Sequence, residues 1–294
     1  VTVTDGSGGT DTKNLEITVT GTNDKPVLDQ IQAQSATEDG NKVTGTVTST
    51  DVDAHETASY SAPSIGGFSI DPTTGAYTFD PSHSAYQHLD AGDKEVVTIP
   101  ITVTDQDGGT DTKKLVITVT GTADKAQIAG TDTGSVTEDK THQAAGQLTV
   151  TDLDAGQDYF QSGDITAAHG TLHLKSDGSW TYDLDSSNPD VQALGTGKAG
   201  TAASLTETVE VQSADGTKHS ITVTVHGTND NPVLNAITAS SATEDGGVAK
   251  GTITSTDVDK GDTATYSTTA NVAGFHLKDD GTYTFDPTDG AYTG

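Results

Sequence analysis

The chain has 294 residues, of which 43 are Asp or Glu and 14 are Lys; it contains neither Arg nor Cys, and its formal net charge is -29. This charge excludes nucleic acid and anionic membrane surfaces as partners, because both are bound through basic patches, and it favours bound cations. Without Cys, stability must come from burial and from ions rather than from disulfides. Low hydrophobicity (31%) with high charge is also typical of disorder, so a folded chain must be argued from its patterns.

The sequence repeats itself at a period of about 100 residues. Residues 1–25 and 101–125 are identical at 19 of 25 positions. A Glu-Asp pair, an Asp-x-Asp motif and a TGTND-like junction each occur three times; the pairs begin at Glu38, Glu138 and Glu244, the motifs at Asp51, Asp152 and Asp257, and the junctions span 20–26, 120–126 and 226–232. We therefore expect the C-terminal remnant of a preceding repeat (1–24), two full repeats (25–124 and 125–230) and a truncated third repeat (231–294).

Strand patterns dominate the first full repeat. Val43, Gly45 and Val47 alternate with Thr over 43–50, and Val, Ile or Leu recurs at every second position over 97–103 and 115–119, as in strands with one buried face. Turn-forming clusters lie between them at 71–75 and 108–109, and residues 84–89 predict one short helical turn. Strands at this spacing, seven or so in each 100 residues, predict an all-β fold of tandem immunoglobulin-like Greek-key sandwiches joined by short linkers.

The Asp-x-Asp motifs follow the second strand of each repeat. Side chains two apart in an extended segment point the same way, so Asp51 and Asp53 can aim both carboxylates at one point. Clustered carboxylate and carbonyl oxygens suit Ca²⁺, which takes six to eight oxygen ligands. Zn²⁺ is disfavoured, because the 9 His residues show no repeated ligand spacing. Asp is also a common turn former, and we expect only that role for Asp71, Asp80, Asp177 and Asp183.

The order of these motifs resembles the cadherin repeat. Residues 229–267 contain an NDN linker followed by Pro, then a Glu, then an Asp-x-Asp with Gly close behind; residues 68–80 read FSIDPTTGAYTFD, and residues 89–95 read LDAGDKE, a loose form of the cadherin LDRE loop. Residues 170–185 look more like the bacterial VCBS repeat. The resemblance implies cadherin-like sandwiches of a large, secreted bacterial RTX adhesin, with Ca²⁺ held between successive repeats.

The resemblance also implies a ligand set at each junction. A cadherin junction uses the Glu and the LDRE loop of the upper domain, the linker, and the Asp-x-Asp of the lower domain. The first junction would then use Asn23, Asp24, Asp51, Asp53 and Asp105. The middle junction would use Glu38, Asp90, Glu95, Asp124, Asp152 and Asp154. The last junction would use Glu138, Asn229, Asp230, Asn231, Asp257 and Asp259.

The chain departs from the cadherin pattern at several positions. The middle linker carries Ala123 where Asn is expected, and Ser213 occupies the place of Asp105, with Asp215 two residues on. The second repeat has no recognisable LDRE loop, so Asp190 or Glu207 is a possible substitute. We therefore expect one or two ions per junction rather than three.

These observations predict a calcium-stiffened extender of an extracellular, cell-surface-attached bacterial adhesin, which projects a binding tip and supports adhesion or biofilm formation. Its expected partners are calcium ions and neighbouring repeats, with the host or surface ligand bound elsewhere in the full protein. An enzyme is not expected, because neither a nucleophile elbow nor a phosphate-binding glycine loop is present. Two alternatives stay open: a glycan- or peptide-binding module, for which the insertion at 188–204 is the candidate, and a spacer in a secreted hydrolase.

Overall fold

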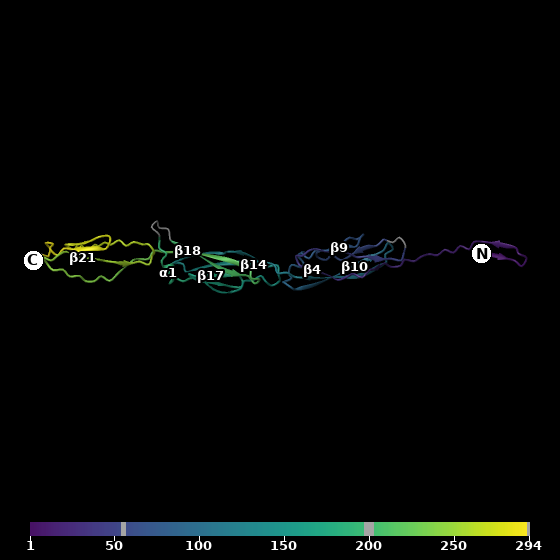
Figure 1. Cartoon of the computed structure of the whole chain (residues 1–294), viewed down its shortest axis with the longest axis horizontal. Coiled ribbons are helices and arrows are strands. Elements are labelled where there is room, and N and C mark those ends of the chain that lie inside the picture. The colour runs from purple at the N-terminus through teal and green to yellow at the C-terminus, as the bar shows by residue number, and fades with distance from the viewer. Residues whose placement is uncertain (54–56, 197–202, 293–294) are drawn as a thin grey trace. The chain divides into compact units, whose positions relative to one another are not determined.

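The computed structural model describes residues 1–53, 57–196 and 203–292, and β-strands make up nearly all of its regular structure (Figure 1). The chain divides into two compact units. One contains Val1–Asp124 with Leu153–Ala155, and the other contains Lys125–Asp152 with Gly156–Gly294. In the described part of the chain, no helix has the length and apolar character needed to span a bilayer.

The first unit contains a β-sandwich preceded by a short hairpin of β1 (Thr2–Thr4) and β2 (Thr10–Thr12). One sheet has the order β4-β11-β10-β7, from strands Gln34–Thr37, Thr110–Thr120, Lys94–Thr104 and Ser59–Ser61. The opposite face is formed by β3 (Val27–Leu28) paired with β6 (Ser49–Thr50), and by β5-β9-β8 (Val43–Thr46, Ala76–Phe79 and Phe68–Ile70). The strand β4 runs parallel to β11, whereas the other pairs are antiparallel, and this strand order is that of an immunoglobulin-like sandwich.

The alternation in the sequence matches the burial of these strands. Ile99, Ile101, Leu115 and Ile117 are fully buried in the core, between exposed or half-buried neighbours. The segment 43–50 forms two short strands instead of one, since β5 ends at Thr46 and β6 begins at Ser49. Residues 84–88 form turns, and residues 189–192 form a short helix that no sequence periodicity predicted.

The second unit repeats this plan with a larger sheet. The order β12-β14-β17-β16-β15 is made by Gln127–Gly130, Gln143–Thr151, Ser179–Leu184, Gly170–Leu174 and Gly163–Thr166. The facing sheet, β13-β19-β18, is made by Thr133–Thr137, Lys218–His226 and Ser204–Gln212. The helix α1 (Pro189–Gln192) lies between β17 and β18 in the chain, and Asn188 caps it by accepting from the Asp190 amide. Strands β20 to β24 then repeat the β3, β5, β6, β8 and β9 pairings; they span Val233–Leu234, Ala249–Thr252, Ser255–Thr256, Phe275–Leu277 and Thr282–Phe285.

A glycine facing an aromatic ring recurs in these sheets. The cross-strand partners are Gly45 and Tyr77, Gly146 and Trp180, and Gly251 and Tyr283. A Cβ on Gly146 would lie 2.5 Å from Cζ2 of Trp180, whose indole is fully buried and donates to the Thr131 carbonyl. The ring therefore occupies the space of the missing side chain, which is why glycine is tolerated inside the strand.

We expect Gly146→Ala to displace Trp180 and to lower the free energy of unfolding by about 1–3 kcal/mol, because overpacking forces a buried ring out of place. Urea unfolding followed by the fluorescence of Trp180, the single tryptophan, measures this effect in the second sandwich. Gly163→Ala is the matched control, since among the described residues nothing lies within 4 Å of its added Cβ. Equal midpoints for the two variants would contradict the packing argument.

Candidate metal centre

The Glu-Asp pairs form a distinctive turn. Asp39, Asp139 and Asp245 adopt left-handed backbone conformations with φ of 55°, 56° and 58°, which non-glycine residues rarely do. The preceding glutamates of the two complete repeats are buried: Glu38 is 1% exposed and Glu138 is 0% exposed. In the two complete repeats the turn therefore directs an acidic side chain into the protein at the end of its sandwich, whereas Glu244 of the third turn is exposed.

Both buried glutamates are held by the same two kinds of donor. The Thr122 amide donates to Glu38 Oε2 over 3.0 Å, and the Thr228 amide donates to Glu138 Oε2 over 3.3 Å. A glutamine side chain donates to the other oxygen in each case. The linkers that contain Thr122 and Thr228 are therefore tied to the Glu-Asp turns.

A second contact recurs where each linker meets the Asp-x-Asp loop. The amide of the linker aspartate donates to Oδ2 of the second Asp of the motif, over 2.7, 2.9 and 2.8 Å in Asp24–Asp53, Asp124–Asp154 and Asp230–Asp259. Within the loop, the Asp53 amide donates to Asp51 Oδ1, and the Asp259 amide donates to Asp257 Oδ1, both over 2.9 Å. The backbone thus fixes two acidic motifs, distant in sequence, beside each other.

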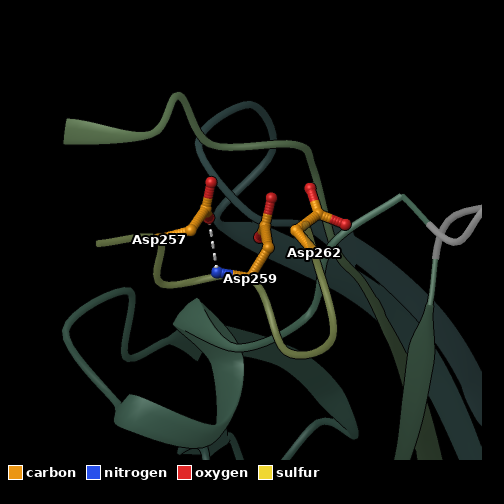
Figure 2. Close-up of side chains that lie close together, drawn as sticks. All are labelled: Asp257, Asp259 and Asp262. Carbon is orange, nitrogen blue, oxygen red and sulfur yellow. Dashed lines mark hydrogen bonds between the residues drawn. The ribbon is translucent and has the colours of Figure 1, made fainter. Parts of the chain in front are cut away.

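At the last junction, inside the second unit, three carboxylates lie close together. Asp257, Asp259 and Asp262 each offer an oxygen within 4.8 Å of the others, and Figure 2 shows their side chains next to one another on one loop. Asp259 is 4% exposed, yet its Oδ1 has no hydrogen-bond partner among residues 1–53, 57–196 and 203–292. The same holds for Oδ2 of Asp230. Buried carboxylate oxygens without donors fit a bound hard cation, because leaving them unpaired costs free energy.

The pKa shifts of acidic side chains at this junction also fit a bound cation. Burial raises the pKa of Glu138, and the charges of Asp230, Asp139 and Asp259 raise it further. Burial also raises the pKa of Asp230, together with Asp139, Asp259 and Asp257. The charged forms repel one another, so positive charge placed among them would stabilise the folded junction.

The first unit contains similar arrangements. Burial raises the pKa of Glu38, with additional contributions from Asp124, Asp39 and Asp154. At the first junction the Asn23 side chain donates to Asp105 Oδ2 over 3.1 Å, which lowers the pKa of that carboxyl, as do the amides of Gly109 and Asp107.

Asp51 completes the first set. Its Oδ2 is buried without a hydrogen-bond partner in the described part of the chain. Asn23, Asp24, Asp51, Asp53 and Asp105 are therefore linked by contacts within the first unit, although the sequence separates them by up to 82 positions.

The structure places the remaining predicted ligands as follows. Asp90 is exposed and accepts from the Ala91 amide, while Glu95 lies 3.6 Å from the His88 ring. Asp152 belongs to the second unit, where its amide donates to Asp158. Asn229 is exposed and donates to the Asp230 carbonyl, and Asn231 is exposed.

The departures from the cadherin pattern have structural explanations. Ser213, at the place of Asp105, is fully buried and donates to Asp215. Burial alone would raise the pKa of Asp215, but donors from Ser213, Thr217 and the Ala126 amide outweigh it and lower the pKa to about 2. Asp215 therefore fixes its own loop and the linker through hydrogen bonds.

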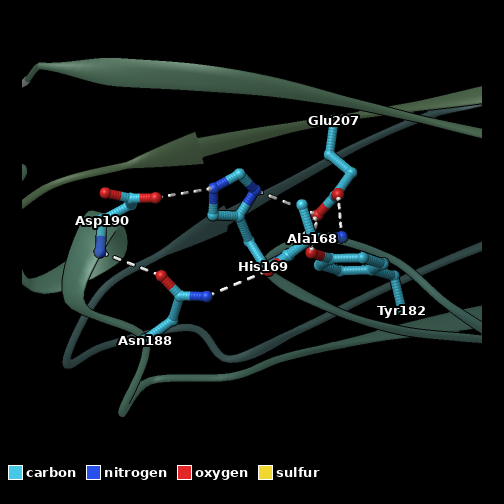
Figure 3. A network of polar contacts seen from close by, with 6 residues as sticks. All are labelled: Ala168, His169, Tyr182, Asn188, Asp190 and Glu207. Atoms are coloured by element: carbon cyan, nitrogen blue, oxygen red, sulfur yellow. Dashed lines mark hydrogen bonds and ion pairs between the residues drawn. The ribbon is translucent and has the colours of Figure 1, made fainter.

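Glu207 is engaged inside the second sandwich and does not replace the LDRE acid. Its carboxylate accepts from the amides of Ala168 and His169 over 2.6 and 3.1 Å and from the Tyr182 hydroxyl (Figure 3). Burial, and to a smaller extent the hydrogen bond to Glu207, raises the pKa of Tyr182. Asp190 is 85% exposed and lies 4.0 Å from the His169 ring.

The turn prediction for aspartates holds at three positions and fails at one. Asp71, Asp80 and Asp177 each accept from amides two or three residues ahead. Asp183 instead lies in β17, where it contacts Gln143 and His173, so the turn interpretation was wrong there. The sequence patterns did not identify Asp262, Gln87 and Gln192 as residues of the junctions. For Asp262, the order D-V-D-K-G-D at 257–262 is the one sequence signal that could have indicated it.

Family comparisons agree with this fold. Residues 123–227 match the model of the bacterial cadherin-like domain, and residues 23–118 match that of a bacterial Ig domain. No curated protein matches the chain. The chain is thus built of tandem cadherin-like and immunoglobulin-like repeats, modules that are typically extracellular and non-enzymatic and that, in the cadherin-like case, usually bind calcium. The cadherin-like match falls on the second repeat, where residues 170–185 had suggested a VCBS repeat. The first repeat, where residues 68–80 and 89–95 had suggested a cadherin repeat, matches the bacterial Ig domain.

Solved structures with a similar fold include cadherin ectodomains. The chain is similar to the protocadherin gammaB7 EC3-6 cis-dimer structure (16% identity, 90% of this chain and 66% of that chain, TM-score 0.50). It is also similar to the protocadherin gammaB4 extracellular domain (17% identity, 92% of this chain and 45% of that chain, TM-score 0.51). A third similar structure is mouse cadherin-23 EC22-24 (14% identity, 90% of this chain and 88% of that chain, TM-score 0.50). The chain spans less than two thirds of the length of the first two, and at these identities the likeness shows the fold alone.

Acid should weaken the second sandwich through Asp215. The pKa of its carboxyl is about 2 in the folded chain against 3.8 as a reference value, so its contribution is complete above the reference pKa and is lost as pH falls towards 2. We expect Asp215→Asn to lower the free energy of unfolding by about 1–2 kcal/mol at pH 7. Urea titrations read by Trp180 fluorescence should show this difference shrinking between about pH 4 and pH 2; a difference independent of pH would contradict the assignment.

Proposed function

We propose that this chain is part of the extender of an extracellular bacterial adhesin, in which Ca²⁺ bound at the repeat junctions stiffens a row of β-sandwiches. The observation that carries the proposal is Oδ1 of Asp259, which is buried without a donor among the described residues and lies next to Asp257 and Asp262. Glu138 and Asp230 belong to the same junction through the Thr228 and Asp230 amides.

The donor set selects the type of ion. At the last junction Glu138, Asp230, Asp257, Asp259 and Asp262 would hold it, and all of them offer carboxylate oxygen. Such a set favours Ca²⁺ over Zn²⁺, which prefers nitrogen and sulfur, and over Mg²⁺, which demands strict octahedral geometry. A bound Ca²⁺ would supply the positive charge that the clustered acids lack.

The expected role follows from affinity and location. Extracellular calcium modules bind at roughly 10⁻⁴–10⁻³ M, so the sites would fill outside the cell and stay empty inside it. An ion that holds a linker and the Asp-x-Asp loop together would restrict the angle between repeats. The ligand sets of the first and middle junctions, attachment to the cell surface, the RTX context and biofilm formation are parts of this proposal.

A ligand-binding module has less support. The insertion at 188–204 was its candidate, but residues 197–202 lie outside the described residues, and the described portion forms α1 and its flanks. A spacer within a secreted hydrolase would use the same junctions, so it shares the stiffening mechanism and differs only in what the flanking segments do.

We expect small-angle scattering to report a longer and stiffer particle in millimolar calcium than in chelator, because bound ions fix the junctions. Asp257→Asn with Asp259→Asn should lower the number of bound calcium ions and reduce this change. Asp71→Asn with Asp177→Asn removes the same charge from turn positions and should leave both readouts as in the wild type. Identical scattering profiles with calcium and with chelator would refute the proposal.

A further inference from the structure

The two complete repeats place equivalent turns beside their buried glutamates. In the first, Tyr86 and Leu89 are buried on either side of Gln87. In the second, Val191 is fully buried and Leu194 packs against the core, on either side of Gln192. The sequences YQHLD (86–90) and VQALG (191–195) therefore correspond, although only the second includes a helix.

Contacts with the linkers confirm this correspondence. A Cβ on Gly121 would lie 2.4 Å from the Leu89 carbonyl, and a Cβ on Gly227 would collide with the Leu194 carbonyl. The Lys260 amide donates to the Ala193 carbonyl over 3.1 Å, as the Ala155 amide donates to the His88 carbonyl over 3.2 Å. Leu194-Gly195 is thus the second-repeat counterpart of Leu89-Asp90.

The glutamine in each turn reaches the buried glutamate. Gln87 Nε2 donates to Glu38 Oε1 over 3.2 Å and to Asp39 Oδ1 over 3.0 Å. Gln192 Nε2 donates to Glu138 Oε1 over 2.6 Å. The amide leaves each glutamate oxygen a lone pair for another partner, because a carboxylate oxygen can accept more than one bond.

The turn also decides how much charge each junction carries. Asp90 adds a carboxylate to the turn of the first repeat, whereas Gly195 adds none. A Cβ on Gly195 would lie 2.9 Å from Asp259 Cγ, so a larger side chain does not fit there. At the last junction this turn therefore contributes a neutral side chain, Gln192, which contacts Glu138 of the same repeat near the loop of Asp257, Asp259 and Asp262.

We propose that Gln87 and Gln192 are positioning residues of the junction sites. Each holds the carboxylate of a buried glutamate in place and, as a neutral donor, lets the acidic junction stay folded before an ion binds. This inference rests on the proposed calcium function. It adds that the glutamine amide sets the calcium affinity of the site, because an acid at the same position would bind calcium more strongly.

Hydrogen–deuterium exchange of the full chain tests the role of Gln192 locally, through the peptide 226–232, which contains the Thr228 and Asp230 amides. In Gln192→Glu we expect this peptide to exchange faster in chelator, because the new carboxylate faces Glu138 and repels it. The exchange rate in chelator divided by the rate in calcium should be about tenfold higher than in the wild type, because the added carboxylate is also a calcium ligand. In Gln192→Leu we expect faster exchange in both conditions and a ratio below that of the wild type, because Glu138 loses its donor.

Two controls make the result specific. Gln147→Glu adds the same charge in the same sandwich and also removes amide hydrogen bonds, here to the Leu148 and Asp177 carbonyls, so the ratio for 226–232 should stay as in the wild type. The peptide 120–126 should be unchanged in the Gln192 variants. Equal acceleration by Gln192→Glu in chelator and in calcium would overturn the positioning role and leave the calcium proposal standing. No calcium effect on 226–232 in the wild type would overturn the calcium proposal itself.

Discussion

Mutual repulsion among buried carboxylates is the constraint on which the junctions of this chain depend. Glu138 is fully buried and Asp259 nearly so, and with Asp230 they form a group in which burial and like charge raise the pKa of Glu138 and of Asp230. Backbone amides and one glutamine offset part of that cost. With 14 Lys and no Arg against 43 acids, the chain has few cationic side chains to offset the rest, and an external cation is the remaining source of charge.

The sandwiches and the junctions are stabilised by different parts of the sequence. Alternating Val, Ile and Leu on the long hairpins fill the cores, and the facing aromatic rings lie over strand glycines. The acids gather where one repeat ends and the next begins, at the Glu-Asp turns and Asp-x-Asp loops. Under the proposed calcium function, this division would allow a repeat to fold by apolar burial while the order of its junction responds to calcium.

Sequence periodicity was sufficient to predict the fold, because strands β10 and β11 expose one face and bury the other at period two. Recurrence likewise identified Glu38, Glu138 and the Asp-x-Asp motifs, which the structure brings to the linkers. It could not identify Gln87 and Gln192, because a single glutamine in a turn carries no periodic signal and its partner is 49 or 54 positions away. Nor could it show that Ser213 and Asp215 replace a ligand by a closed hydrogen-bonded loop, since that depends on burial.

Calcium titration calorimetry of the 294-residue chain tests the central claim most directly. The account predicts saturable binding in the range of roughly 10⁻⁴–10⁻³ M, with the number of ions reduced by Asp257→Asn with Asp259→Asn. Absence of saturable binding in millimolar calcium, or binding whose stoichiometry is unchanged by that double substitution, would contradict it.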